Sequence, residues 1–370
     1  MNWKYLENYH PNTIQLQCNW MEELAQTPQD PIFHAEGDVA THTFMVLEEL
    51  QGSPFFQERT ALEKEILKAA ALFHDIEKRS TTVIEANGRI SSRGHAKKGA
   101  LSVRKMLYQQ GNTPFSIREQ IAALVKYHGI PIWIFEKENP LKTLFTTSLA
   151  LNTQLLGLLA TADIKGRICA DQEEMLYKIA LFQAYCEEQE CWGVARTFET
   201  SLAKFHYFQK DNAPANYIPF EKETFEVVLM CGLPGTGKDH HIQQKYPDWP
   251  VISLDSIRKG LKIAAGDKKQ TGKVVATAKE QAKIYLRKKQ RFVWNATNVT
   301  RKMRKQLIDA WSVYRPKICI DYVEVPFQKL LVQNQARTAI VPFKVIENML
   351  SKLEIPTADE AHEVHYFISP

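Results

Sequence analysis

The first half of the chain has the hydrophobic periodicity of helices. From Asp38 to about Tyr207, apolar residues recur every three or four positions, and long runs of β-branched residues are absent. This spacing places apolar side chains on one face of each helix, and such a face is stable only when it is buried. We therefore expect residues 1–210 to form an all-α domain.

The pattern changes after residue 210. The polar segment QKDNAPANYIPFEKET (209–224) contains two prolines, which indicates a linker at residues 211–223. Between residues 224 and 370, short apolar segments alternate with helical ones. The predicted strands cover 225–231, 250–254, 291–296 and 317–325, and the predicted helices cover 273–290 and 301–314. This alternation predicts an α/β domain with a parallel sheet flanked by helices, so the fold class is multidomain.

Composition is that of a globular protein with two cores. The 370 residues are 44% hydrophobic and 24% charged. The six cysteines have no CxxC spacing, so we expect them to be reduced and mostly buried. No segment reaches the roughly 18 apolar residues of a membrane span, and the first ten residues lack a secretion signal pattern. We expect a cytoplasmic protein without a membrane partner.

Charge is distributed unevenly. Residues 1–220 carry a net charge of −4 and residues 221–370 a net charge of +9, which together give the +5 of the whole chain. The basic second half favours an anionic partner, although a solvated basic surface explains the charge equally well.

A glycine-rich segment in the second half fits a phosphate-binding loop. VVLMCGLPGTGKDHHI (227–242) contains G-x-x-x-x-G-K between a predicted strand and a predicted helix, an arrangement that aims backbone N–H groups at phosphate. Lys238 supplies a cation for the β- and γ-phosphates of ATP. Asp239 replaces the usual Ser or Thr, and its carboxylate could hold Mg²⁺ directly or through water. The expected nucleotide-binding residues are Gly232, Gly235, Thr236, Gly237, Lys238 and Asp239. The alternative is a tight turn without a ligand.

A carboxylate and an arginine follow the next predicted strand. In VISLDSIRKGL, Asp255 comes just after the strand and Arg258 one turn later. At that edge of a parallel sheet, Asp255 could accept a proton from an attacking hydroxyl, and Arg258 could bind a substrate phosphate. The alternative is a helix-capping Asp beside a surface Arg.

Together with LDSIR, NATNVTRKMRKQL and VQNQARTAIVPFKVI, this loop resembles the P-loop domain of polynucleotide 5′-hydroxyl kinases over residues 225 to about 350. The resemblance implies that Asp255 is the general base, Arg258 binds the phosphate next to the acceptor nucleoside, and Arg337 in a lid contacts ATP. Two positions depart from the family pattern: Asp239, and Gln333 in place of a second lid arginine. Related metabolite kinases share part of these motifs.

The helical half carries imidazoles and carboxylates on faces that are otherwise apolar. His42, His74, His128 and Asp163 follow Leu, Ile, Val or Ala at helical spacing, and burying such groups without a partner costs about 1–3 kcal/mol each. Metal coordination removes that cost, and mixed nitrogen and oxygen ligands suit Mn, Fe, Co, Ni or Zn. The alternative is a set of hydrogen-bonded core residues. The expected ligands are His42, His74, Asp75, His95, His128 and Asp163.

FHAEGDVATHT, ALFHDIEK and LLATADIKGR resemble the HD phosphohydrolase superfamily over residues 34 to about 170. The resemblance implies a first metal at His42, His74, Asp75 and Asp163. It implies a second metal at His95 and His128, bridged to the first by Asp75. Lys78 would hold a phosphate oxygen, unless it is a solvent-facing lysine. His34 and Arg167 are weaker candidates for substrate contact.

The order of the two halves resembles bacterial fusions of an HD domain with a polynucleotide kinase, which heal broken nucleic-acid ends. The resemblance implies an RNA or DNA substrate with a 5′-hydroxyl and a 2′,3′-cyclic or terminal 3′-phosphate, leaving ends that a ligase joins. RKMRK (301–305) and RKKQR (287–291) could line the strand's path or be solvated helix faces. The alternatives are an HD nucleotidase joined to a metabolite kinase, and an ATP-sensing regulator without turnover.

Overall fold

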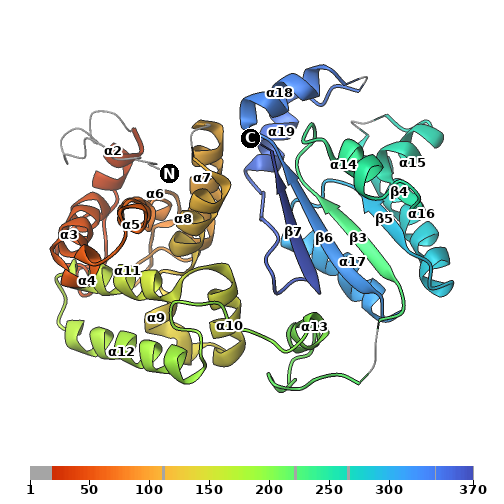
Figure 1. The fold of residues 1–370 in the computed structure, drawn as a ribbon. Helices are drawn as coiled ribbons and strands as arrows, with labels where there is room; N and C mark the ends of the chain where they lie inside the picture. The colour runs from red at the N-terminus through yellow and green to blue at the C-terminus, as the bar shows by residue number, and fades with distance from the viewer. Residues whose placement is uncertain (1–18, 111–112, 221–222, 265–266, 338, 370) are drawn as a thin grey trace. The chain divides into compact units, whose positions relative to one another are not determined.

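The computed structural model describes residues 19–110, 113–220, 223–264, 267–337 and 339–369, and the chain divides into two compact units (Figure 1). The first unit is Met1–Arg196 and the second is Thr197–Pro370. The predicted start of the first domain, residues 1–18, lies outside the described residues, as do residues 221–222 of the predicted linker.

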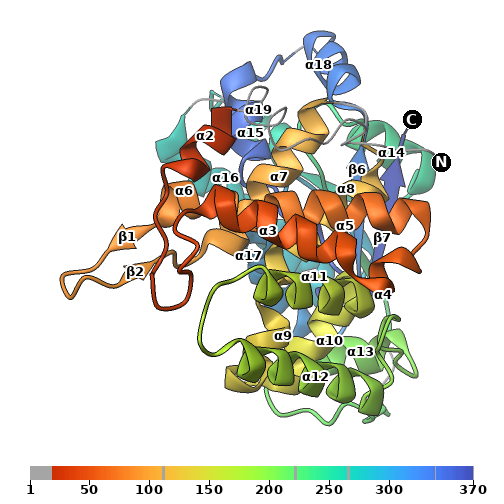
Figure 2. The ribbon, with the colours of Figure 1, turned by 90° about the vertical axis from the view of Figure 1, so that its left-hand side faces the viewer.

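The first unit is helical (Figure 2). Its core helices pack around α5, which contacts α3, α8 and α11, while α7 packs on α8. Side-chain caps define several helix starts: Asp38 accepts a hydrogen bond from the Thr41 N–H, and Thr60 forms a capping box with Glu63. The elements are α2 Asn19–Ala25, α3 Val39–Gly52, α4 Pro54–Gln57, α5 Ala61–Phe73, α6 Lys78–Thr81, β1 Val83–Ile84, β2 Ile90–Ser91, α7 His95–Gln110, α8 Phe115–Tyr127, α9 Ile130–Trp133, the 3-10 helix η1 Ile134–Glu136, α10 Pro140–Ala150, α11 Thr153–Lys165 and α12 Gln172–Glu188.

The second unit is a five-stranded parallel sheet in the order β4-β5-β3-β6-β7. The elements are α13 Ser201–Gln209, β3 Glu226–Cys231, α14 Lys238–Lys245, β4 Val251–Ser253, α15 Leu254–Gly260, α16 Lys268–Arg287, β5 Phe292–Asn295, α17 Arg301–Ser312, β6 Lys317–Glu324, α18 Phe327–Gln335, α19 Phe343–Leu350 and β7 Glu363–Ile368.

Alternation along β5 shows that helices cover both faces of this sheet. Phe292 and Trp294 contact Trp311 of α17, with ring centroids 5.6 Å apart in both pairs. Val293 between them packs in a cluster with Ile242 of α14. Because successive side chains of a strand point to opposite faces, α17 and α14 lie on opposite faces of the sheet. The predicted fold class, an all-α domain followed by a parallel α/β domain, is confirmed.

Two features differ from the sequence-based picture. Strand β7 was not predicted, because its residues are only half-buried or exposed and carry no continuous apolar run. Helix α13, which the sequence assigned to the first domain, groups with the second unit, since Phe205 stacks on His362 with ring centroids 3.9 Å apart.

The segment RKMRK (301–305) was one of two considered to line the path of a nucleic-acid strand. Within this segment, Arg304 is not available to a ligand. It is 0% exposed, and its Nε and Nη2 atoms donate to the two carboxylate oxygens of Glu360 at 2.7 and 2.8 Å. Arg301 of the same segment pairs with Asp359. These two arginines bind carboxylates of their own chain, so they belong to the packing of the second unit.

Replacing Arg304 with alanine is expected to destabilise the second unit by about 3–5 kcal/mol, because the buried carboxylate of Glu360 loses both of its guanidinium hydrogen bonds and keeps mainly the one from the Thr357 N–H. Urea unfolding followed by tryptophan fluorescence, to which Trp294 and Trp311 of the second unit contribute, measures this. The control is Lys305→Ala, whose exposed pair with Asp309 is worth at most about 1 kcal/mol. Equal effects of the two substitutions would contradict the structural role of Arg304.

Among the described residues, no single helix is both long enough and apolar enough to cross a membrane. Helices α10 and α11 pass that test only as a pair, and the chain bends by 106° between them.

Candidate active sites

The six predicted metal ligands of the first unit come from five helices and converge at one place. His42 lies within α3 and Asp163 within α11, whereas His74 and His128 cap the C-termini of α5 and α8. His95 is the first residue of α7. All except His95 are buried, so the inward orientation expected from their helical spacing is what the structure has.

Backbone carbonyls determine which nitrogen of each imidazole carries the proton. The Nδ1–H groups of His74, His95 and His128 donate to the carbonyls of Ala71, Ser92 and Val125 at 2.7, 2.7 and 2.9 Å. A carbonyl can only accept, so Nδ1 is protonated in all three rings, and the neutral ring presents a lone pair at Nε2.

The Nε2 atoms of the four histidines face one another in two pairs. The Nε2 atoms of His95 and His128 are 3.3 Å apart, and those of His74 and His42 are also 3.3 Å apart. Two acceptor atoms at this distance repel unless a proton or a cation lies between them. Burial lowers the pKa of His128 to about 3, so its ring is neutral at ordinary pH.

The carboxylate of Asp75 lies between the two histidine pairs. Its Oδ2 atom is 3.2 Å from His74 Nε2, and its Oδ1 atom is 3.2 Å from His95 Nε2. Oδ1 is buried and has no hydrogen-bond partner among the described residues. Asp163 completes the first group, with Oδ1 3.1 Å from His42 Nε2. The predicted ligands therefore form two sets, His42, His74 and Asp163, and Asp75, His95 and His128. A third group of possible donors, His34, Glu36 and His42, shares His42 with the first set.

This donor set fits divalent cations. An orphaned carboxylate oxygen and facing imidazole lone pairs are costly in a buried site, and a cation in each set would satisfy them. Neutral imidazoles with carboxylates match the transition ions expected from the sequence.

Two cations neutralise the buried carboxylates in this structure. Lys78 Nζ lies 2.7 Å from Asp75 Oδ2, and Arg167 Nη2 lies 2.8 Å from both oxygens of Asp163. Burial disfavours ionisation of both aspartates, but the charges of Lys78 and Arg167 outweigh it and hold each pKa well below its usual range. Both carboxylates are therefore ionised and ready to bind metal.

Sequence reasoning missed two residues that support the site. Glu36 Oε1 lies 2.8 Å from His34 Nδ1 and 3.0 Å from His42 Nδ1, while its Oε2 accepts a hydrogen bond from the Ile168 N–H. Glu36 therefore holds the His42 ring so that its Nε2 atom faces Asp163, as a carboxylate bonded to the far nitrogen of a metal-binding histidine does. Gln29 accepts a hydrogen bond from Lys78 at 2.7 Å. Glu36 lies in the FHAEGD motif, two residues after His34. This closeness to a histidine was the feature of the sequence that could have identified it.

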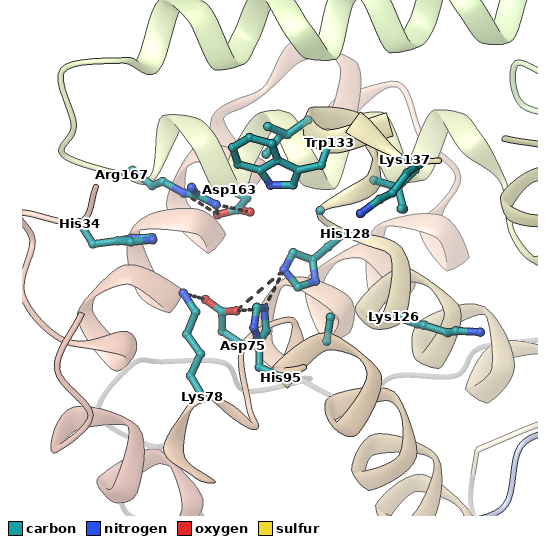
Figure 3. A pocket seen from close by; sticks show the side chains of 14 residues that line it. His34, Asp75, Lys78, His95, Lys126, His128, Trp133, Lys137, Asp163 and Arg167 are labelled. Atoms are coloured by element: carbon teal, nitrogen blue, oxygen red, sulfur yellow. Dashed lines mark hydrogen bonds and ion pairs between the residues drawn. The ribbon is translucent and has the colours of Figure 1, made fainter. Parts of the chain in front are cut away.

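Four of the predicted ligands, Asp75, His95, His128 and Asp163, line a cavity of about 340 Å³ (Figure 3). His34, Lys78 and Arg167 lie on one side of it, and Lys126, Trp133 and Lys137 line the other. The predicted substrate contacts Lys78, His34 and Arg167 thus share one cavity with the metal ligands.

In the second unit, the glycine-rich loop follows β3 and leads into α14. Gly232 has φ +145°, and a Cβ atom there would lie 2.4 Å from the carbonyl oxygen of Val323. Gly237 has φ +89° with open space around it. The first glycine therefore allows close packing, and the second provides the left-handed turn at the N-terminus of α14. Thr236 is buried, and its hydroxyl donates to the carbonyl of Leu233.

The ammonium group of Lys238 folds back over this loop. It donates to the carbonyls of Gly232 and Leu233 at 3.0 and 2.7 Å. Burial lowers its pKa to about 8, which the negative charge of Asp239 partly opposes. A phosphate bound at the loop would offer stronger acceptors than these carbonyls.

The pKa of Lys238 predicts a pH dependence. The ligand-free protein loses this positive charge as the pH rises through about 8, so ATP affinity is expected to fall above that pH. In Lys238→Arg the guanidinium stays charged, so the decrease should disappear. Calorimetric titration with ATP between about pH 6.5 and 9.5 tests this, and an equal decrease in the variant would contradict it.

The carboxylate of Asp239 has a hydrogen-bond partner in the second unit. Its Oδ1 atom accepts a hydrogen bond of 2.6 Å from the side-chain amide of Asn295, at the end of β5. This amide orients the carboxylate and leaves Oδ2 for another ligand. Asn295 was not among the residues selected from the sequence, because its relation to Asp239 is set by the pairing of β3 with β5.

The remaining predicted kinase residues form a second charged cluster. Asp255 lies in the first turn of α15 with its side chain 67% exposed. Arg258 Nη1 is 3.1 Å and Arg337 Nη2 is 3.6 Å from its carboxylate. Gln333 on α18 has a buried side-chain oxygen without a hydrogen-bond partner among the described residues. Asp255 and Arg337 both influence the pKa of Lys238, so they lie within electrostatic range of the loop.

Comparisons with known proteins identify both halves. Residues 39–156 match the model of the HD domain, and residues 227–356 match a model of an AAA domain. A search of curated proteins finds no match. Among solved structures, a candidate kinase from Chloroflexus aurantiacus J-10-fl is 16% identical. That match covers 40% of this chain and 87% of the other, with a TM-score of 0.34, which is too low to carry an argument.

The chain therefore joins an HD phosphohydrolase-type domain to a kinase-like P-loop domain. HD domains bind divalent metals, and the described residues contain matching histidine and aspartate groups. A P-loop kinase fold implies a nucleotide and Mg²⁺.

Proposed function

We propose that this protein is a bifunctional enzyme that repairs the ends of nucleic-acid strands. The HD unit would hydrolyse a 2′,3′-cyclic or terminal 3′-phosphate, and the P-loop unit would transfer the γ-phosphate of ATP to a 5′-hydroxyl. The two activities would leave a 3′-hydroxyl and a 5′-phosphate, the ends that a ligase joins. The observation that carries the hydrolase half is Asp75, whose two oxygens each face a different histidine pair.

In the HD unit, His42, His74 and Asp163 would hold one divalent ion, and His95 and His128 the other, with Asp75 shared between them. When bound, such ions act as Lewis acids and lower the pKa of water. The ammonium of Lys78 lies at the cavity wall, where Asp75 and Gln29 accept two of its three N–H bonds. A phosphate oxygen can accept the third. His34 lies on the same side of the cavity.

In the P-loop unit, the N–H groups at the start of α14 and the ammonium of Lys238 would bind the ATP phosphates. Asp255 would accept the proton of the attacking hydroxyl, and Arg258 and Arg337 lie 3.1 and 3.6 Å from its carboxylate. Arg258 and Arg337 would exchange their contacts with Asp255 for phosphate oxygens. Asp239, oriented by Asn295, would contribute a charged oxygen to Mg²⁺.

A strand, rather than a small metabolite, is favoured by charge. The net charge of +9 over residues 221–370 suits a partner that brings several phosphates. The exposed segment RKKQR (287–291) remains available for such contacts, since its residues are all exposed.

The deciding experiment uses one RNA with a 5′-hydroxyl and a 2′,3′-cyclic phosphate, incubated with ATP and either Mg²⁺ or a transition metal. Both ends are then read by gel mobility and mass spectrometry. We expect a 5′-phosphate that depends on ATP, and loss of the cyclic phosphate that depends on metal and not on ATP.

Two results would contradict the proposal. If nucleosides or other small hydroxyl compounds are phosphorylated and a short 5′-hydroxyl oligonucleotide does not compete, the protein is a metabolite kinase joined to a nucleotidase. If ATP binds but neither end of any substrate changes, the chain is a nucleotide sensor.

A further inference from the structure

The cations around the HD cavity are of two kinds. Lys78 and Arg167, on one side, are bound to the carboxylates of Asp75 and Asp163. Lys126 and Lys137 line the opposite side, where the side chain of Lys126 extends away from His128 (Figure 3). Neither forms an ion pair with a carboxylate within the described part of the chain. Lys126 donates only to the hydroxyl of its neighbour Tyr127, at 3.0 Å. The second side therefore carries positive charge that no carboxylate among the described residues pairs with.

An aromatic ring lies on the same side of the cavity. Trp133 lines it and is 38% exposed, although a tryptophan gains most from burial. Lys178 of α12 lies 5.1 Å from the centre of the indole ring, where Glu174 holds it at 2.9 Å. One face of the indole is thus covered by the protein, and the part that lines the cavity is available to a ligand.

A short backbone segment connects this ring to the predicted metal ligand His128. His128 ends α8, Gly129 follows, and the single-turn helix α9 (Ile130–Trp133) begins at once. Pro131 and Ile132 of that turn are buried, which limits the motion of the segment. The geometry therefore couples Trp133 to His128 through one short and well-packed turn.

We propose that Trp133, Lys126 and Lys137 form a subsite for the nucleotide next to the reacting end of a single strand. A base stacks on Trp133, and the two lysines bind the phosphate that follows it. This inference rests on the proposed hydrolase function and specifies its substrate as a polynucleotide end. Proteins that bind single strands combine aromatic rings for the bases with cations along the backbone, as these residues do.

A free mononucleotide would not use this set of residues fully. Its only phosphate is the one that reacts, and the metal ligands, Lys78 and Arg167 already account for that group. A nucleoside triphosphate has its phosphates in direct succession, with the base beyond them at one end. Along a nucleic-acid strand, phosphates and bases follow one another in turn. This order matches the cavity, which has cations on both sides of the metal ligands and the indole ring of Trp133 on one of those sides.

The test compares kcat/KM for three substrates: a short RNA ending in a 2′,3′-cyclic phosphate, the corresponding cyclic mononucleotide, and bis(p-nitrophenyl) phosphate, which has no base. The wild-type protein should prefer the RNA. In Trp133→Ala the ratio of RNA to bis(p-nitrophenyl) phosphate should fall by roughly 10- to 100-fold, the effect of removing one stacking ring, and Trp133→Phe should restore most of it. Hydrolysis of bis(p-nitrophenyl) phosphate by the same preparations reports on folding of the HD unit, because that unit contains both Trp133 and the hydrolase site.

The lysines are tested by binding, without turnover. Fluorescence anisotropy of a labelled RNA with a 3′-hydroxyl end, measured in EDTA, gives the dependence of affinity on salt. In the double variant Lys126→Ala, Lys137→Ala the slope of log K against log salt should decrease by about 1.4, the value for two lost contacts to a single strand. The control removes two lysines of α5 that do not line the cavity, Lys64→Ala and Lys68→Ala, and should keep the wild-type slope.

The failures are distinguishable. If the wild-type protein hydrolyses none of the three substrates with any metal, the proposed function fails, and the subsite fails with it. If it hydrolyses the mononucleotide as well as the RNA, or if Trp133→Ala reduces all three activities equally, the hydrolase stands and the subsite is wrong. An unchanged salt slope in the lysine variant would also overturn the subsite.

Discussion

Replacing Asp75 with asparagine is expected to lower the rate of hydrolysis by the HD unit by about 100-fold or more, because this one carboxylate faces both histidine pairs. An amide offers one oxygen and one NH₂ group. In the variant, the NH₂ group would replace the carboxylate oxygen that faces either His74 or His95. An NH₂ group has no lone pair to offer a cation at that position. Loss of the negative charge also removes the attraction for two divalent ions held between neutral imidazoles.

Metal content and hydrolysis should decline together in this variant. Calorimetric titration with Mn²⁺ measures the number of ions bound, and the variant should bind at least one fewer than the wild-type protein. The control is Glu188→Gln, which removes one exposed carboxylate from α12 of the same unit and should retain both properties. Kinase activity should persist in both variants. Full metal binding by Asp75→Asn would show that the two histidine pairs do not share this ligand.

Replacing Lys238 with alanine is expected to lower phosphate transfer by about 100- to 1,000-fold, the usual effect of removing one group that stabilises transition-state charge. The ammonium is already buried at the loop and donates to two carbonyls, so a phosphate that replaces them gains a charge-assisted hydrogen bond. Transfer of labelled γ-phosphate from ATP to a 5′-hydroxyl oligonucleotide measures the loss.

Hydrolysis by the HD unit should be retained in Lys238→Ala. The matched control is Lys279→Ala, which removes an exposed lysine of α16 outside the loop and should leave transfer at the wild-type rate. If Lys238→Ala removed hydrolysis as well, the two activities would depend on one site and the division between units would be wrong.

Much of the fold could be predicted from local pattern. The alternation of apolar segments located β3, β4, β5 and β6, and each was observed. The three- and four-residue spacing placed His42, His74, His128 and Asp163 on inward faces, and all four are buried. β7 was not predictable in this way, because a half-exposed edge strand has no distinct apolar run. The metal and phosphate roles of the site residues remain predictions.

The support of both sites depends on contacts between distant parts of the chain. Glu36 reaches the N–H of Ile168 across 132 residues, and Asn295 reaches Asp239 across 56. The helical spacing of Arg304 gave no indication that Glu360 would bind it. Trp133 looked like any apolar residue of a short segment until the cavity placed it beside the metal ligands.

The sequence by itself determined the types of element, their order, the inward faces and the glycine loop, because periodicity and backbone conformation are properties of neighbouring residues. Only the tertiary structure decided that Glu36 reaches His42 and Ile168, that Asn295 orients Asp239, and that Lys126 and Lys137 line the same cavity as Trp133. Those relations are distances between side chains on different helices and strands, and packing in three dimensions sets them.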